Sequence, residues 1–119
     1  MGTYKDLKVW QMNQVCIKDY LSIPKLMPTT FEFRHIFRQL FRSITSIGAN
    51  IAEGHESDSN KEFARYLKIS IGSAVETDHW LITLTNLLDK KVAEIEKLTA
   101  LNLEVIKMLK GLKKSIESR

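Results

Sequence analysis

Apolar residues recur at steps of three and four along almost the whole chain, and this period constrains the fold more than any other feature. The clearest run is Phe33, Ile36, Phe37, Leu40, Ile44, Ile47 and Ile51. Such spacing places the apolar side chains on one side of an α-helix, where other helices can bury them. The sequence therefore predicts helices that pack together through apolar faces.

The same period predicts four helices, over residues 6–23, 32–53, 60–89 and 92–117. The first should stop before Pro24, because proline cannot donate to a continuing helix, and residues 24–31 should form a connection. Gly54 is expected just past the end of the second helix. Ser59 is expected to cap the third, with Glu62 completing a capping box. Four long helices with short links predict a single-domain, all-α, antiparallel up-down-up-down four-helix bundle.

Composition excludes several other classes of protein. The chain has 119 residues, which suits one domain, and its 5 Gly and 2 Pro are too few turn formers for a sandwich or barrel of short strands. Its single cysteine, Cys16, excludes an internal disulfide and a cysteine-rich zinc site, and its place in the helical period predicts a core residue. Neither an 18-residue apolar run nor a signal peptide is present, so a cytoplasmic protein is expected.

Two Glu-x-x-His pairs are candidate metal ligands by their spacing. Glu32 with His35, and Glu76 with His79, have the spacing seen in four-helix carboxylate proteins. However, the apolar stripes of both helices would turn these side chains away from the core. The chain also lacks a Gly-x-Ser-x-Gly elbow, a phosphate-binding loop and a dinucleotide fingerprint. We therefore expect no catalytic residue, no metal, no cofactor, no small-molecule substrate and no enzymatic activity.

The net charge is +4, and the excess of positive charge lies in residues 105–119. Two basic rows follow helical spacing and are candidates for contact with nucleic-acid phosphates. The arginine row is Arg34, Arg38 and Arg42, and the lysine row is Lys107, Lys110 and Lys114. The alternative is that both rows are ordinary solvated faces. Neither row has the interleaved aromatic residues of a single-strand binder.

Several residues break local helix rules. Gly48 and Gly72 fall inside predicted helices, where glycine costs about 1 kcal/mol relative to alanine. They indicate close backbone approach between helices, or alternatively tolerated weak spots. Glu53 lies in the last turn of its helix, where the helix dipole disfavours an anion, one turn after Asn50. This position suggests a cationic partner elsewhere, or alternatively a solvated carboxylate.

Several of these residues belong to a longer motif. The run from Ser46 to Gly54, the segment from Ser59 to Phe63, and the later Gly72, Ser73 and Glu76 together resemble the 23S rRNA-intervening-sequence proteins. The resemblance covers nearly the whole chain and implies a small four-helix bundle of a family first noticed inside bacterial 23S rRNA genes. No catalytic residues are known for the family. The candidate motif or assembly residues are Asn50, Glu53, Gly54, Gly72, Ser73 and Glu76.

The resemblance also bears on assembly and partners. The family is similar to the accessory proteins of diversity-generating retroelements, which form five-fold barrels and bind nucleic acid and a reverse transcriptase. It therefore implies a homo-oligomer, with a pentamer expected, and Ile69, Trp80 and Leu87 are candidate contacts between subunits. Two functions stay open: binding of RNA or DNA through the basic rows, or an oligomeric scaffold for a protein partner.

Overall fold

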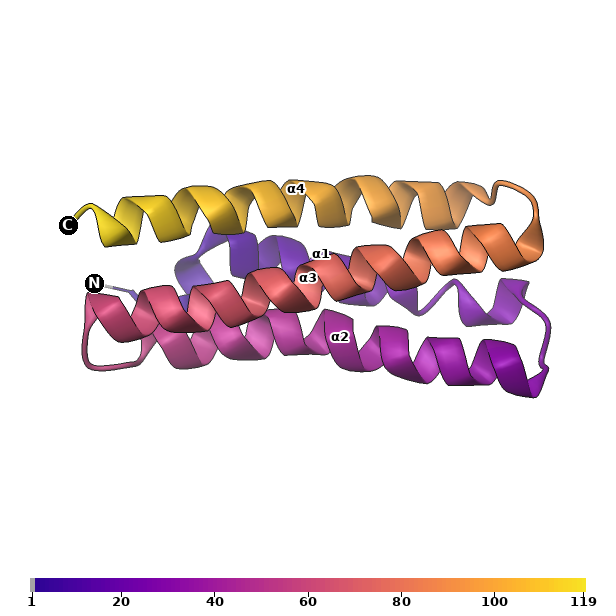
Figure 1. The fold of residues 1–119 in the computed structure, drawn as a ribbon, viewed down its shortest axis with the longest axis horizontal. Helices are drawn as coiled ribbons and strands as arrows, with labels where there is room; N and C mark the ends of the chain where they lie inside the picture. Colours follow the sequence, from indigo (N-terminus) through magenta and orange to yellow (C-terminus); the bar gives the residue numbers. More distant parts are fainter. Residues whose placement is uncertain (1) are drawn as a thin grey trace.

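A computed structural model describes residues 2–119 as a bundle of helices, 47 Å long and 21 by 20 Å across (Figure 1). The chain order is η1 (Tyr4–Asp6), α1 (Lys8–Tyr20), η2 (Pro24–Leu26), α2 (Phe31–His55), α3 (Asn60–Leu88) and α4 (Ala93–Glu117), where η marks a short 3₁₀-helix. No strand occurs within residues 2–119. Successive long helices run in opposite directions, so the prediction of an all-α up-down-up-down bundle is confirmed.

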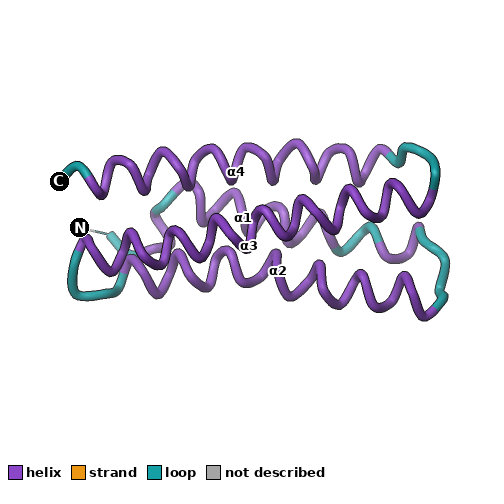
Figure 2. Tube along the Cα trace, viewed as in Figure 1, coloured by secondary structure: helices purple, strands orange, loops and turns teal. Residues whose placement is uncertain are grey.

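The α2–α3 loop and the α3–α4 loop lie at opposite ends of the bundle (Figure 2). Helix α3 packs against α2 and α4, and α1 packs against the same two helices from the other side. Helices α2 and α4 therefore lie across a diagonal. This arrangement decides which surface residues can share one face.

The first helix is shorter than predicted. Thr3 and Asp6 form a reciprocal capping box around η1, and Leu7 is extended, with φ −74° and ψ 125°. This extended residue separates Asp6 from the helix, so α1 begins at Lys8. At its other end α1 stops at Tyr20, whose hydroxyl donates to the backbone carbonyl of Phe37 at 3.0 Å. The expected boundaries at residues 6 and 23 were therefore wrong.

The turn between α2 and α3 corrects one prediction and supports half of another. Gly54 is not the residue beyond α2: it lies inside the helix and is buried, and Glu56 is the C-cap. Ser59 caps α3 as predicted, because its hydroxyl accepts the backbone N–H of Glu62 at 3.1 Å. The Glu62 carboxylate does not complete the capping box, since it accepts from Arg65 instead.

The core contains the predicted apolar stripes and, in its middle, a layer of polar side chains. Ile44, Leu67, Leu81 and Leu109 are among the fully buried apolar residues. The buried polar residues are Asn13, Ser43, Ser70, Thr77 and Asn102.

Each member of this polar layer bonds to a neighbouring helix. Asn13 donates to the Ile44 carbonyl at 3.0 Å, and Asn102 to the Ala74 carbonyl at 2.9 Å. Ser70 donates to the Ile47 carbonyl at 2.8 Å. Ser43 and Thr77 share a hydrogen bond of 2.8 Å between their hydroxyls. Because an unpaired buried polar group costs free energy, these hydrogen bonds favour one relative position of the helices.

Candidate nucleic-acid interface

The motif segment of α2, residues 46–54, is mainly a packing element. A methyl group at Gly48 would lie 2.6 Å from Oδ1 of Asn13, so Gly48 lets the amide of α1 rest against α2. A methyl group at Gly54 would lie 2.6 Å from Cβ of Tyr66 and 3.3 Å from the Phe63 carbonyl oxygen, so Gly54 lets α3 approach. The close contact at Gly48 is made by the Asn13 side chain and not by the backbone approach that was predicted, and Gly54 makes a second close contact.

Gly72 behaves differently from these two glycines. It lies on the exposed side of α3, and nothing among residues 2–119 lies within 4 Å of a methyl group built there. The close approach expected at Gly72 is therefore not made by another helix of this chain. The neighbouring Ser73 is half-buried, and its backbone carbonyl accepts the Thr77 hydroxyl at 2.9 Å.

Asn50 and Glu53 have local explanations. The Asn50 amide donates to the Ser46 carbonyl of its own helix at 2.9 Å, which accounts for this residue without a partner. Glu53 is exposed, and among residues 2–119 no cation pairs with it. The cationic partner suggested for Glu53 is therefore not supplied by the described part of the chain.

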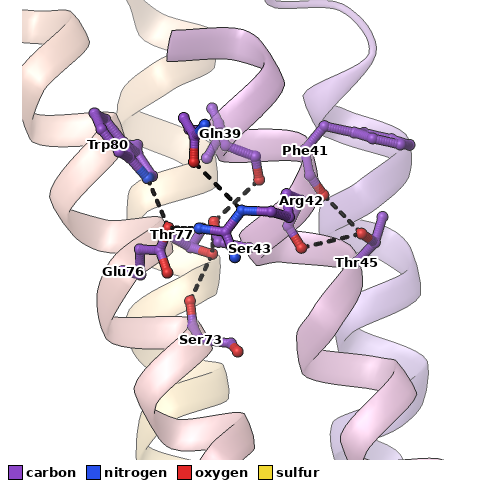
Figure 3. A network of polar contacts seen from close by, with 10 residues as sticks. Gln39, Phe41, Arg42, Ser43, Thr45, Ser73, Glu76, Thr77 and Trp80 are labelled. Atoms are coloured by element: carbon purple, nitrogen blue, oxygen red, sulfur yellow. Dashed lines mark hydrogen bonds and ion pairs between the residues drawn. The ribbon is translucent and has the colours of Figure 1, made fainter. Parts of the chain in front are cut away.

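Glu76 accepts hydrogen bonds from two residues on the outer side of the α2–α3 pair (Figure 3). Its Oε2 atom accepts from Nη2 of Arg42 in an ion pair and from Nε1 of Trp80 at 3.1 Å. Arg42 also donates from Nε to Oε1 of Gln39 at 3.3 Å. Arg42 and Glu76 thus join α2 to α3, and the guanidinium is already engaged by a carboxylate.

The rest of the arginine row is also only partly available. Arg34 donates to the backbone carbonyl of Thr29 at 2.6 Å, across the start of α2. Arg38 is exposed, and within residues 2–119 it forms no ion pair. The three arginines therefore share a helix face but differ in their hydrogen bonding. In the described structure, only the Arg38 guanidinium of the three has no protein acceptor.

The lysine row lies elsewhere on the molecule. Lys107, Lys110 and Lys114 are all exposed on α4, in the half that leads to the C-terminus. The arginine row lies in the first half of α2, near the end of the bundle that is opposite to the C-terminal half of α4. Helix α2 is also diagonal to α4 (Figure 1). The structure therefore does not join the two predicted rows into one surface.

The structure instead brings a second basic segment beside the lysine row. Lys61, Arg65 and Lys68 lie on the first two turns of α3, and the α3–α4 packing places them next to the last turns of α4. Residues 60–68 and 105–119 together hold eight basic and two acidic residues, a net charge of +6, whereas the whole chain carries +4. We call this surface the basic end. The steps of four and three between these α3 residues could have indicated a basic row on α3. Only the antiparallel packing shows that this row lies beside the basic residues of α4.

The candidate subunit contacts lie mainly on the outer side of α3. Ile69 is 41% exposed and Leu87 is 54% exposed, while Trp80 is half-buried against the core. Val75 and Ile82, also on α3, are 52% and 49% exposed. Four of the ten large exposed apolar residues of the described chain therefore belong to this one helix.

Metal-ligating and nucleophilic groups are not gathered into a site. Among residues 2–119, no group of three or more His, Cys, Asp or Glu side chains is placed to hold a metal ion. Glu76 is engaged by Arg42 and Trp80, and the His79 ring packs edge-on against Trp80 with centroids 4.7 Å apart. Cys16 is fully buried, and burial together with Asp19 raises the pKa of its thiol to about 11. A thiol held neutral in this way is a poor nucleophile.

None of the helices over residues 2–119 is both long enough and apolar enough to cross a bilayer.

These features define a small antiparallel four-helix-bundle protein in which Gly48 and Gly54 allow close helix packing and positive charge is concentrated at one end. The chain belongs to the 23S rRNA-intervening sequence protein family, because the family model matches residues 5–111. The resemblance drawn from the motif residues is thereby confirmed.

A comparison with solved structures agrees with the fold. A solved structure from Bacteroides thetaiotaomicron, described as a protein with unknown function from the S23 ribosomal protein family, aligns with a TM-score of 0.75. It is 24% identical and covers 89% of this chain and 98% of that one, so the likeness supports the shared fold alone. No curated protein matches the sequence.

Proposed function

We propose that this protein is a non-enzymatic bundle that binds RNA or DNA through phosphate contacts made by its basic end. The observation that carries the proposal is the segregation of charge: eight basic residues against two acidic ones on the first turns of α3 and the last turns of α4. Such a patch attracts a polyanion, and phosphate contacts from lysine and arginine supply most of the sequence-independent affinity for nucleic acid.

Within the basic end, the lysine row is the main candidate for backbone contacts. Lys107, Lys110 and Lys114 are exposed, and within residues 2–119 none of them forms an ion pair. The arginine row is a weaker candidate, because Arg42 is held by Glu76 and Arg34 by the Thr29 carbonyl. Separate tests of the two rows therefore discriminate between them.

The test measures the binding affinity for structured rRNA fragments and for single strands. Fluorescence anisotropy reports the binding at salt concentrations between about 50 and 200 mM. For single strands log K falls with log salt at about 0.7 per phosphate contact, so a triple Lys→Gln variant of the lysine row should reduce the slope by about 2. A control that replaces Arg34 and Arg38 by glutamine removes two charges, so it would reduce the slope by about 1.4 if both made contacts and should reduce it by less than that. No binding of the unmodified protein at about 50 mM salt would refute the proposal.

We further propose that the protein is a homo-oligomer in which α3 contributes the contact between subunits. The exposed side of α3 presents Ile69, Val75, Ile82 and Leu87, and Gly72 leaves open space among them. Exposed apolar surface of this kind on a small protein favours a protein interface. Five copies is the number that the family resemblance implies. Under this proposal the α3 surface could equally receive a protein partner.

Light scattering after size exclusion, at micromolar concentration, tests the oligomer. Gly72→Leu adds a large side chain where this chain has none nearby, so folding should persist while assembly is lost. Gly111→Leu is the matched control, because Gly111 on α4 is also surrounded by open space. A monomer for the unmodified protein, or equal assembly of both variants, contradicts the proposed contact.

A further inference from the structure

The basic end contains a cavity of about 700 Å³ between the start of α3 and the end of α4. We call it the end pocket. Five basic side chains line it, Lys61, Arg65, Lys68, Lys113 and Arg119. Ala64 and Ile116 contribute the apolar part of its wall. Its volume lies in the range of sites that hold a small molecule or one unit of a polymer.

Two carboxylates also line the end pocket, but both are already neutralised. Glu62 accepts from Arg65 at 3.2 Å, and Glu117 accepts from Lys113 at 2.8 Å. The hydrogen bond from Arg65 lowers the pKa of Glu62, so this carboxylate stays ionised at neutral pH and below it. Three cations, Lys61, Lys68 and Arg119, therefore line the cavity without a carboxylate partner in the described structure.

The end pocket adjoins the lysine row. Lys110 and Lys114 lie within one turn of Lys113 on α4, and Lys113 lines the cavity. A nucleic-acid strand that follows the lysine row along α4 would thus reach the pocket at the end of the bundle. The row lies exposed along α4, whereas the pocket is a partly open hollow with room for one group.

We propose that the end pocket binds the terminal phosphate of a nucleic-acid strand, an inference that rests on the proposed nucleic-acid binding. An internal phosphodiester carries one negative charge and is flanked by nucleotides on both sides. A terminal phosphate carries about −1.5 to −2 at pH 7 and exposes three oxygens, so it can enter a pocket and pair with several cations. The three uncommitted cations match this charge better than that of an internal phosphate.

The experiment compares short single-stranded RNAs of one sequence that carry a 5′-phosphate, a 3′-phosphate or hydroxyls at both ends. Each is labelled at the end that carries no phosphate, and binding is followed by anisotropy at about 50 mM salt. A phosphorylated end should tighten binding by about 5- to 10-fold, the effect of a charge-assisted hydrogen bond. The second pKa of a phosphomonoester is about 6, so this ratio should shrink as the pH falls to about 5.

Two lysine variants locate the effect. Lys68→Gln should bring the ratio close to 1, because Lys68 lines the pocket. Lys110→Gln is the matched control. It should weaken the binding of all the RNAs and leave the affinity ratio between phosphorylated and unphosphorylated RNA unchanged. Both residues are exposed, so each variant should retain the wild-type circular dichroism spectrum and melting temperature. Lys61→Gln provides a second pocket variant if Lys68→Gln does not fold.

The possible failures are distinguishable. If no RNA binds, the proposed function fails and the pocket assignment fails with it. If all three RNAs bind with equal affinity, nucleic-acid binding stands and the pocket assignment is overturned. A phosphate preference that survives Lys68→Gln and Lys61→Gln places the terminal phosphate elsewhere and also overturns it.

Discussion

Alanine substitutions at Gly54 and Gly72 should change stability in opposite directions, although both glycines lie inside helices. Alanine is favoured over glycine in a helix by about 1 kcal/mol. At Gly72 the new methyl group meets nothing within 4 Å, so Gly72→Ala should stabilise the protein by about 0.5–1 kcal/mol. At Gly54 the methyl group meets Cβ of Tyr66 at 2.6 Å, and neither atom can rotate away.

The size of the effect at Gly54 follows from this distance. Carbon atoms make favourable contact at about 3.5–4.0 Å, so α2 and α3 would have to separate by about 1 Å. Overpacking of this kind typically costs about 1–3 kcal/mol. Because the helix-propensity gain is shared by both variants, it cancels in their difference. We therefore expect Gly54→Ala to be less stable than Gly72→Ala by about 1–3 kcal/mol.

Urea unfolding followed by circular dichroism at 222 nm measures this difference. With a slope of about 1–3 kcal/mol per molar urea, the two midpoints should differ by about 1 M. The comparison is made at two protein concentrations, because an oligomer gains stability by mass action and Gly72 lies on the proposed contact helix. Equal midpoints, or a Gly54→Ala protein more stable than Gly72→Ala, would refute the packing role assigned to Gly54.

Three further predictions concern the core and the α2–α3 contact. Asn102→Ala removes a buried hydrogen bond and leaves a cavity, so the free energy of unfolding, measured by urea unfolding, should fall by about 1–3 kcal/mol. A change below about 0.5 kcal/mol would exclude a stabilising role for the amide. The raised pKa of Cys16 means that the unfolded thiol ionises first as the pH rises, so stability should fall between about pH 9 and 11, by up to about 3 kcal/mol. Cys16→Ala should reduce this loss, and the part that remains belongs to Tyr20, whose pKa is also raised by burial. A double-mutant cycle on Arg42 and Glu76 should give a coupling of only about 0.2–1 kcal/mol, because the side chains are 59% and 35% exposed; a value above 2 kcal/mol would contradict this reasoning.

The apolar period was sufficient to predict the fold, because a helix with one apolar stripe must bury it. Every residue from Ile36 to Ile51 that the α2 seam predicted as apolar core is buried. The start of α1 was not predictable from the same period, since it depends on a local capping box at Thr3 that competes with helix extension. The buried Asn13 and Asn102 were missed for a similar reason: amides carry no apolar signal, and only their positions against backbone carbonyls explain them.

The surface was harder to predict than the core. The lysine row could be recognised from composition, but the end pocket combines residues about 50 positions apart, such as Lys61 and Lys113, which only the antiparallel packing of α3 and α4 brings together. Conversely, Arg42 looked free in sequence, and its pairing with Glu76 depends on the relative height of α2 and α3. Charge spacing along one helix therefore predicts a face, but not which of its charges another helix will neutralise.

The two buried asparagines restrict how this bundle can move. If α4 slid along α3 by one turn, the Asn102 amide would lose its hydrogen bond to the Ala74 carbonyl, at a cost of about 1–3 kcal/mol for one unpaired group. Asn13 imposes the same condition between α1 and α2. Sliding of one helix along its neighbour is therefore opposed in both the α1–α2 pair and the α3–α4 pair. A partner that changes the conformation of this protein should therefore separate the helices laterally. Lateral separation breaks each amide–carbonyl hydrogen bond once, and the same bonds form again when the helices return.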